Sequence, residues 1–350
     1  MPTTQRLDVL IVSLGSTEGL RTADAELHDA LLRAGANVAI VSSRRPEPMR
    51  TLMLTDLAWA WAARRTAAGV IAGLQGSPPR AIVYSSTTAA LLWPCPGAIR
   101  FDAAAAGNRP GRHGLWQRPL ERRRLGQAPL LLPWSEGGLR EAPAAARSGD
   151  RALVVPVPVE SSGPPPPERD IAAITYAANP AKKGLDRVLA AWRGVRAELP
   201  AGAPRELVVT GASEQALGDA GVELGQEPGV RVVGSLPARD YRALVRRARV
   251  FVCAPRREDY GISQLEALAD GCLLVSTPAP GPYAALPLAR TLDPRLVSDD
   301  LEGALRAALL EPASGYAERA REALAPFSRE AVERLVADEL LARLLGGPYR

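Results

Sequence analysis

The segment APRREDYGISQLEALADG, at 254–271, combines residue types that suit the binding of an anion and of hydroxyl groups. The strand-like run before it would deliver Glu258 to its carboxyl edge. Gly261 would let the backbone approach a ligand closely, and the amides from Gly261 through Ile262 and Ser263 to Gln264 could bind a phosphate. Glu266 would lie in the first turn of a helix that starts at Ser263, within reach of the same ligand.

Each of these residues also has a purely structural explanation. Ser263 and Glu266 match an S-x-x-E capping box, which would account for Glu266 without any ligand. Glu258 could be an ordinary loop carboxylate. We favour a ligand site because these features share one domain, lie at the carboxyl ends of strands and have complementary chemistry.

The stretch NPAKKGL, at 179–185, holds Lys182 and Lys183, the only lysines among 43 lysine and arginine residues. A lysine ammonium is a compact point charge with rotatable donors, whereas a guanidinium is broad and planar. The alternatives are a solvated turn before the next helix and, above all for Lys182, compositional drift. We interpret Lys183, beside Gly184, as the cation of the site.

Two series of alternating strands and helices position these residues, and the proline-rich stretch 156–170 separates them. The first series predicts a helix at 23–35 and strands at 8–15, 37–43, 80–86, 129–135 and 152–158. The second predicts helices at 184–199, 238–248 and 263–271, and strands at 171–178, 205–213, 230–236, 250–255 and 272–278.

Strands separated by helices predict an α/β protein with two Rossmann-like, doubly wound parallel-sheet domains facing a cleft. We expect a first domain at 1–160, a linker at 161–170, a second domain at 171–325 and a C-terminal helix at 326–350. Ser328 is the expected N-cap of that helix, which we expect to cross back to the first domain.

Length and composition limit the class of protein. A chain of 350 residues, 47% of them apolar, is large enough for two cores. No apolar run is long enough to span a bilayer, and the first strand begins too early for a signal peptide, so we expect a cytoplasmic protein. The three cysteines are scattered along the chain, which suits reduced thiols in the core. With only two histidines, we expect no zinc site.

Positive charge is concentrated in the first half, where residues 1–160 carry 19 arginines against 13 acidic residues. Seven of these arginines lie between Arg100 and Arg124. Such a surface favours an anionic partner, whether lipid head groups, a phosphorylated acceptor or nucleic acid, although a solvated arginine face is an equal alternative. A helix at 115–125 with an apolar side and an arginine side would suit a peripheral position at the inner face of a membrane.

The same region, at 101–114, is the expected functional loop of the first domain. Asp102 follows a strand-like run, and His113 stands among glycines and arginines. A loop histidine is more often a bystander than a catalyst.

The second half resembles the nucleotide-sugar-binding domain of retaining GT-B glycosyltransferases of family 4, the large group 1 family. The resemblance rests on KKGLDRVLAAW, on RVVGSLPARDYRALVRRARVFVCAPRREDYGISQLEALADGCLLVS and on the E-x7-E pair within it, and covers much of 180–277. It implies that Lys183 contacts the donor diphosphate, that Glu258 lies by the donor sugar and that Glu266 binds ribose hydroxyls. Members of that family often have a histidine of the first domain near the donor sugar, and the resemblance implies that His113 has this place here.

Three positions depart from the family's pattern. Ala178 stands where members commonly carry an arginine, five residues before the lysine. The glycine-rich segment near the start is reduced to SLGSTEG, with Gly15 as its candidate donor contact. APGPYAALP replaces the acidic residue expected after the strand CLLVSTP.

The resemblance implies a retaining transferase that moves a sugar from a nucleoside diphosphate sugar to an acceptor hydroxyl on a glycan, a lipid or a small molecule. No D-x-D motif occurs, so we expect no metal and no cofactor, and we expect no nucleic-acid partner. The alternatives are a degenerate GT-B protein that binds a nucleotide sugar without turnover, and a GT-B phosphorylase or epimerase. A nicotinamide oxidoreductase is disfavoured because no G-x-G-x-x-G follows either first strand.

Overall fold

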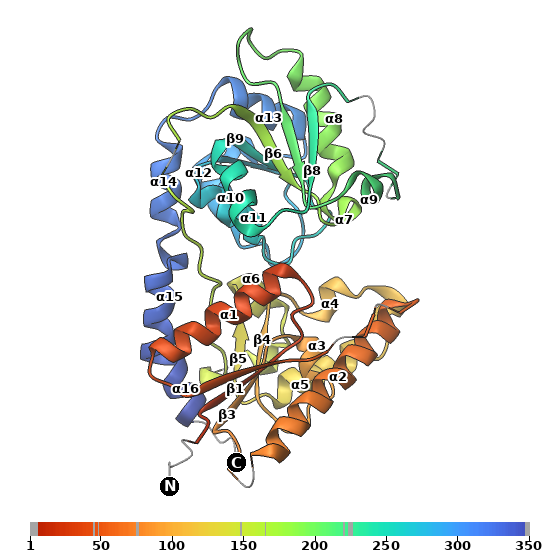
Figure 1. The fold of residues 1–350 in the computed structure, drawn as a ribbon, viewed down its shortest axis with the longest axis vertical. Coiled ribbons are helices and arrows are strands. Elements are labelled where there is room, and N and C mark those ends of the chain that lie inside the picture. The colour runs from red at the N-terminus through yellow and green to blue at the C-terminus, as the bar shows by residue number, and fades with distance from the viewer. Residues whose placement is uncertain are drawn as a thin grey trace. The chain divides into compact units, whose positions relative to one another are not determined.

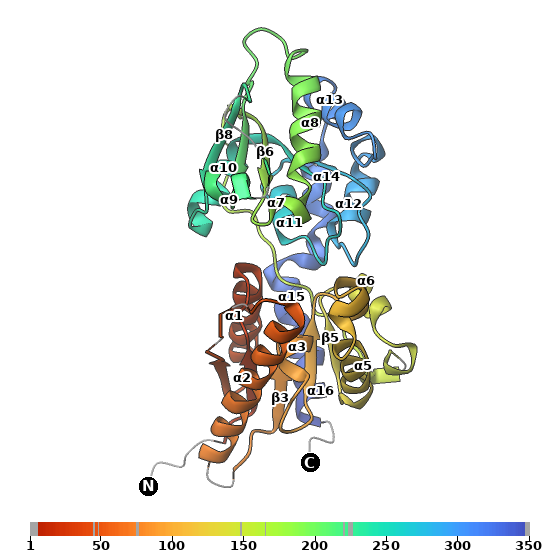
Figure 2. The ribbon, with the colours of Figure 1, turned by 90° about the vertical axis from the view of Figure 1, so that its right-hand side faces the viewer.

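A computed structural model describes residues 6–44, 46–47, 49–74, 77–147, 149–164, 166–219, 221–222 and 227–346, with only the backbone of His113 and Gly149. The chain forms two compact units (Figures 1 and 2). Unit 1 comprises Met1–Pro158 and Phe327–Arg350, and unit 2 comprises Val159–Pro326. Each unit is built around its own parallel sheet.

The sheet of unit 1 has five parallel strands in the order β2-β1-β3-β4-β5. The strands are β1 (Val9–Ser13), β2 (Val38–Ser42), β3 (Ala81–Tyr84), β4 (Ala98–Phe101) and β5 (Leu131–Pro133). The central strand β1 is buried along its whole length. Its uninterrupted apolar run is typical of a strand covered by helices on both faces.

Helices cover both faces of this sheet. One layer holds α1 (Glu18–Arg33), α15 (Arg329–Leu335), a π-helical turn (Val336–Leu340) and α16 (Leu341–Gly346). The other holds α2 (Leu52–Gly73), α3 (Thr87–Ala90) and α5 (Gln117–Gln127). The short helices α4 (Ala105–Asn108) and α6 (Glu136–Glu141) follow β4 and β5.

The C-terminal segment returns to unit 1, as expected. Arg329 donates to Glu26 of α1 at 2.9 Å, and Val336, Leu340 and Leu344 join the core of α1 and the sheet. Ser328 caps α15, because its hydroxyl oxygen accepts the amide of Ala331 at 3.2 Å.

The prediction of a strand at 152–158 is wrong. Leu153 and Val155 donate to the carbonyls of Leu131 and Pro133, each at 2.9 Å, but only Ala152 forms a bridge, with Leu131. Pro133, Pro156 and Pro158 have no N–H, so the regular ladder of a strand pair cannot continue there.

The sheet of unit 2 also has five parallel strands, in the order β10-β9-β6-β7-β8. They are β6 (Ile171–Tyr176), β7 (Leu207–Thr210), β8 (Val230–Gly234), β9 (Ala248–Cys253) and β10 (Leu273–Ser276). The two doubly wound parallel sheets expected from the sequence are thereby confirmed.

The helices of unit 2 lie on both sides of its sheet (Figure 2). α8 (Leu185–Arg196) packs on α13 (Leu301–Leu310), and α10 (Ala238–Arg247) packs on α11 (Ile262–Ala269). The remaining helices are α7 (Pro180–Lys183), α9 (Glu214–Asp219), α12 (Ala285–Leu292) and α14 (Tyr316–Ala323).

Residues 160–162 of the proline-rich stretch are docked on unit 2. The amide of Ser162 donates to Asp270 at 2.7 Å, and Arg246 donates to the carbonyl of Ser162 at 2.7 Å. Arg242 donates to the carbonyl of Glu160 at the same distance. The chain at 160–162 is therefore held by side chains of α10 and of the end of α11.

Candidate functional site

The short helix α7 positions Lys183. Asn179 caps it by accepting the amide of Lys182 at 2.9 Å, and Pro180 occupies its first turn, where a missing N–H costs nothing. Gly184 ends α7 with φ at +65°, and a Cβ there would overlap the carbonyl oxygen of Ala254. A glycine is needed on both counts, and it lets α7 lie against the end of β9.

Lys183 and Glu258 form an ion pair at this end of the sheet. The ammonium of Lys183 lies 2.7 Å from Oε2 of Glu258, and the amide of Gln264 donates to the same oxygen at 3.0 Å. Glu258 is 5% exposed. Its backbone amide donates to the carbonyl of Pro280 at 3.0 Å. A buried carboxylate requires such partners, because an unpaired charge there would be costly.

Lys182 has a different partner. Its ammonium lies 2.7 Å from Oδ2 of Asp259, and Nε of Arg257 donates to Oδ1 at 2.9 Å. Burial disfavours the ionised form of Asp259, but the charges of Lys182 and Arg257 outweigh it and hold the pKa of Asp259 below its usual range. The side chain of Lys182 is 44% exposed and that of Lys183 only 19%, so Lys183 is the more enclosed cation.

Gly261, Ile262 and Ser263 form the start of α11, but not in the way expected. The helix begins at Ile262, and Gly261 occupies its N-cap position with φ at +91° and no side-chain cap bond. Ser263 is therefore not the cap, and its hydroxyl donates to Oε1 of Gln264 at 2.8 Å. A Cβ at Gly261 would lie 2.8 Å from the ring of Tyr283, which explains why a glycine starts this helix.

Glu266 is not part of a capping box. Nη1 of Arg242, from α10, lies 3.2 Å from its carboxylate, and Nε of the same guanidinium lies 2.7 Å from Asp270. Burial raises the pKa of Glu266, although the charge of Arg242 opposes the rise. The side chain remains 25% exposed, so it can still meet a ligand.

The other expected site residues, Gly15, Asp102 and His113, belong to unit 1. Gly15 follows β1 with φ at +52°, and its carbonyl accepts Arg21 at 3.1 Å. Asp102 follows β4 and accepts the amide of Ala103 at 2.8 Å. His113 lies in the 3-10 turn Gly111–Gly114, and its side chain is outside the described part of the chain.

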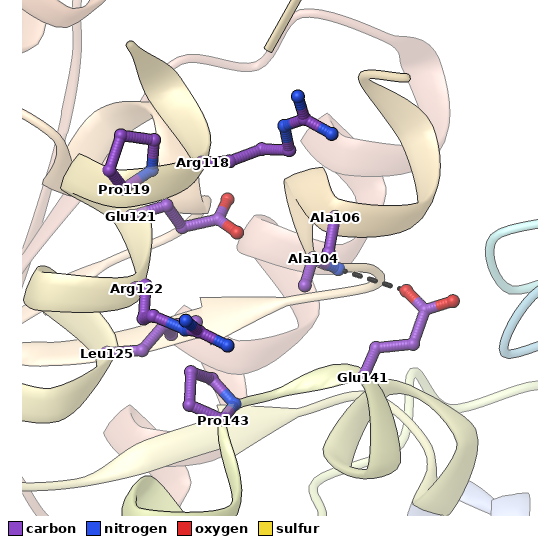
Figure 3. Close-up of a pocket in the computed structure, with 9 residues that line it drawn as sticks. All are labelled: Ala104, Ala106, Arg118, Pro119, Glu121, Arg122, Leu125, Glu141 and Pro143. Carbon is purple, nitrogen blue, oxygen red and sulfur yellow. Dashed lines mark hydrogen bonds between the residues drawn. The ribbon is translucent and has the colours of Figure 1, made fainter. Parts of the chain in front are cut away.

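Unit 1 has a pocket of about 460 Å³ at the carboxyl ends of β4 and β5 (Figure 3). Its walls come from α4, α5 and α6 and the segments beside them. The lining residues are Ala104, Ala106, Arg118, Pro119, Glu121, Arg122, Leu125, Glu141 and Pro143. The expected functional loop at 101–114 thus forms one wall of a pocket.

Two carboxylates hold this loop in place. Glu121 accepts the amide of Ala105 at 2.8 Å. Glu141 accepts that of Ala104 at 3.3 Å, the dashed line in Figure 3. Burial raises the pKa of Glu121 to about 7. The carboxyl group of Glu121 therefore titrates near neutral pH inside the pocket wall.

The arginine-rich stretch from Arg100 to Arg124 is not a uniform basic surface. Arg100 is 1% exposed, donates to the carbonyl of Ala23 at 2.9 Å and lies over the ring of Trp134. Arg109 pairs with the buried Asp56 at 2.8 Å. Arg112, Arg122 and Arg123 are exposed. Some of the arginines that were expected at the surface therefore make contacts within unit 1 instead.

Sequence reasoning missed the roles of three side chains, those of Gln264, Arg242 and Glu121. Gln264 had a signal, because it is a polar residue on the buried face that α11 shares with Leu265 and Leu268. Arg242 had none, since its carboxylate partners are brought to it only by the packing of α10 on α11.

The described residues form neither a candidate metal site nor a membrane-spanning helix. They contain no group of three or more His, Cys, Asp or Glu side chains placed to hold a metal ion. Likewise, none of the helices in the described ranges is long and apolar enough to cross a membrane.

Comparison with known protein families gives a match to most of unit 2. Residues 169–311 match the family described as Glycosyl transferases group 1, a span that includes Lys183, Glu258 and Glu266. A search of curated protein sequences finds no match to the chain.

Solved glycosyltransferase structures share the fold over nearly the whole chain. WaaG, a glycosyltransferase involved in lipopolysaccharide biosynthesis, superposes with a TM-score of 0.71 at 15% identity, over 97% of this chain and 100% of that one. α,α-Trehalose 6-phosphate synthase from Burkholderia multivorans superposes with a TM-score of 0.65 at 15% identity, over 97% of this chain and 98% of that one. Anabaena Alr3699/HepE in complex with UDP superposes with a TM-score of 0.63 at 13% identity, over 95% of this chain and 99% of that one. Residues 169–311 therefore match the group 1 glycosyltransferase family, and the chain has the two-sheet fold of GT-B glycosyltransferases.

Proposed function

We propose that this protein is a retaining glycosyltransferase that moves a sugar from a nucleoside diphosphate sugar to an acceptor hydroxyl. The observation that carries the proposal is the Lys183–Glu258 pair, which lies beside the N-terminus of α11 within the matched domain. A cation, a carboxylate and a helix N-terminus are complementary to a diphosphate joined to a sugar.

The donor would bind through residues of unit 2. Lys183 would contact the diphosphate together with the amides at Gly261, Ile262 and Ser263. Glu266, which is partly exposed, would accept hydrogen bonds from ribose hydroxyls, and Glu258 would lie by the donor sugar. The solved structure of Alr3699/HepE, named as a complex with UDP, supports a nucleotide ligand for this fold.

Lys183 would act in the transition state. As the bond between the anomeric carbon and the phosphate oxygen breaks, negative charge gathers on the leaving diphosphate, and a preorganised ammonium stabilises it. The acceptor oxygen would attack the anomeric carbon from the same face, and its proton would pass to the leaving phosphate. We propose that the reaction needs no metal and no cofactor, since Lys183 and the α11 amides can neutralise the diphosphate.

The acceptor would be bound by unit 1, and a glycan, a lipid or a small molecule would each supply the hydroxyl. The pocket beside the loop at 101–114 is our candidate place for it, because open parallel sheets bind ligands at the carboxyl ends of their strands. Asp102 and His113 remain our candidates for catalytic residues, and Gly15 for a donor contact. We propose a cytoplasmic location.

A second candidate is a protein that binds a nucleotide sugar without turnover. Ala178 favours it, because the family commonly has an arginine at that position. The two candidates share a donor site and differ in chemistry.

The test is a thermal-shift screen of the protein against UDP, GDP, ADP and TDP, followed by hydrolysis and transfer assays with the matching nucleotide sugars. We expect one nucleotide to stabilise the protein and its sugar to be released or transferred without added metal, with the anomeric configuration of the product retained by NMR. Stabilisation without any release or transfer would support the binder. No response to any nucleotide would contradict both candidates.

A further inference from the structure

Helix α2 exposes several of its large apolar side chains to solvent, whereas Trp59, Val70 and Ile71 pack partly against the core of unit 1. The residues that it buries against unit 1 include Ala60, Ala63 and Ala67. Leu54 and Leu57 are 42% and 36% exposed, and Trp61 is 53% exposed. A surface helix normally does the reverse, since burial of Leu and Trp contributes far more than burial of Ala. This pattern indicates that the exposed side of α2 binds a partner.

These three residues form one face, which we call the α2 outer face. Their spacing of three and four residues places them along one side of a helix, a different side from that of the buried alanines. Figure 1 shows α2 at the right edge of unit 1, and in Figure 2 it lies toward the viewer. No described element covers it, as the exposure of Trp61 demonstrates.

Further exposed apolar residues lie at the start of α2 and in the segment bound to it. Met49 and Leu52, at the start of α2, are 50% and 51% exposed, and Leu115 is 61% exposed. Arg109 and Gln117, on either side of Leu115, both bind Asp56 of α2 and tie that segment to the helix. Six of the nine exposed large apolar side chains among the described residues belong to this region. Such a concentration marks an interaction surface, whereas single exposed residues do not.

The charges of this region are positive. Arg50, Arg64 and Arg65 are all exposed. The one acidic residue within 49–74 is Asp56, which is buried and bonded to Arg109. An apolar face that contains a tryptophan and is flanked by arginines at both ends matches the surface of a lipid bilayer with anionic head groups.

A second copy of the chain fits less well. Docking through the same face would bring the arginines of both copies into one interface, with no exposed acid on α2 to pair them. The interfacial helix expected at 115–125 also fits less well. Among the described residues of that stretch, Leu115 is the one exposed large apolar side chain and it precedes α5, whereas Gln117, Glu121 and Leu125 of α5 are buried.

We propose that the α2 outer face docks unit 1 on an anionic membrane surface. Leu54, Leu57 and Trp61 enter the boundary between head groups and acyl chains, and Arg50 and Arg65 bind the head groups. This surface is in unit 1 and does not depend on the donor site of unit 2, so the proposal stands apart from the proposed sugar transfer.

The test uses co-sedimentation of the full chain with vesicles of phosphatidylglycerol and phosphatidylcholine, and with vesicles of phosphatidylcholine alone. We expect binding to the anionic vesicles that weakens as salt is raised, and much weaker binding to the neutral ones. The double variant L57S/W61S should bind at least about tenfold more weakly. Arg65→Gln should bind about fivefold more weakly, the worth of one charge near the head groups.

Leu310→Ser is the matched control, because Leu310 is a similarly exposed leucine, at 37%, in unit 2. It should bind vesicles as the unchanged protein does. The thermal midpoint and the response to nucleotides should be unchanged in L57S/W61S, which shows that it is folded. Equal binding to both kinds of vesicle, no binding to either, or full binding by L57S/W61S would overturn the proposal. So would a dimer in analytical ultracentrifugation that L57S/W61S dissociates, since the occupant would then be a second copy.

Discussion

The ammonium of Lys183 lies 2.7 Å from Oε2 of Glu258, a residue 75 positions later in the chain. The two side chains reach each other because α7 ends at Gly184 against the end of β9. A diphosphate bound to Lys183 would share this cation with Glu258. The same carboxylate also receives the Gln264 amide, so it keeps one hydrogen bond if Lys183 turns toward a ligand.

Lys183→Ala should weaken binding of the nucleoside diphosphate by about 1.5 to 3 kcal/mol, the usual worth of a charge-assisted hydrogen bond. Isothermal titration calorimetry measures this loss. The control is Lys182→Ala, which removes a cation paired with Asp259 and should change affinity much less. Equal affinity of Lys183→Ala and the unchanged protein would refute the phosphate role.

The double variant K183A/E258Q separates binding from stability. Lys183→Ala alone leaves a buried carboxylate without its cation and should lower the free energy of unfolding by about 1 to 3 kcal/mol. Adding Glu258→Gln removes the charge and should restore most of that stability, whereas nucleotide affinity should stay low. If affinity recovers together with stability, Lys183 acts only through the fold.

Glu266→Gln tests the ribose assignment. The variant can still accept a hydrogen bond from Arg242, and the N-cap position of Gly261 excludes a capping role for Glu266. We expect weaker binding of the nucleoside diphosphate but unchanged binding of inorganic pyrophosphate, because only the former has ribose hydroxyls. Lys183→Ala should weaken both. A loss of pyrophosphate binding in Glu266→Gln would instead indicate a general disturbance of the site.

The fold was predictable from the sequence where local pattern and packing agree. Val9–Ser13 and Ile171–Tyr176 are mainly apolar runs, each preceded by an aspartate, and both are strands. The stretch at 152–158 is also mainly apolar, but its prolines interrupt the ladder of backbone hydrogen bonds that a strand requires. Helix α2 was not predicted, because it buries alanines and exposes Leu54, Leu57 and Trp61, which leaves no usual amphipathic pattern.

The candidate site was predictable in part. Lys183, Glu258 and Gly261 stand out by residue type, and the strands place them at one edge of one sheet. The pairing of Lys183 with Glu258, rather than with Asp259, depends on where α7 ends. Ser263 has the residue type of a cap, but the left-handed Gly261 starts the helix two residues earlier. Arg242 could not be predicted, since only tertiary packing brings it to Glu266.

Gly184→Ala should destabilise unit 2 by several kcal/mol. The substitution adds a Cβ that overlaps the carbonyl of Ala254, and it forces a residue with a Cβ to adopt φ at +65°. Gly218→Ala is the control, because Gly218 lies in α9 with no atom within 4 Å of an added Cβ. The control should be neutral or slightly stabilising, as alanine is the better helix former. Urea unfolding of both variants measures the difference, and similar midpoints would contradict this account of α7.

The pH dependence of stability should reveal Glu121. Its pKa is about 7 in the folded protein against an ordinary value of 4.5, and burial is the main cause. The folded state therefore holds this proton more tightly than the unfolded state. The contribution is complete below pH 4.5 and is lost as pH rises through about 7, a loss of about 3 kcal/mol.

Glu121→Gln should remove this loss, because the amide cannot ionise and its oxygen can still accept the amide of Ala105. We expect the thermal midpoint of the unchanged protein to fall, relative to that of Glu121→Gln, between pH 5 and pH 8. Glu136→Gln, at an exposed position in α6, should follow the unchanged protein at every pH. Parallel curves for the unchanged protein and Glu121→Gln would mean that the carboxyl group in the pocket wall is already ionised at pH 5, and that the pocket presents a fixed negative charge to its ligand.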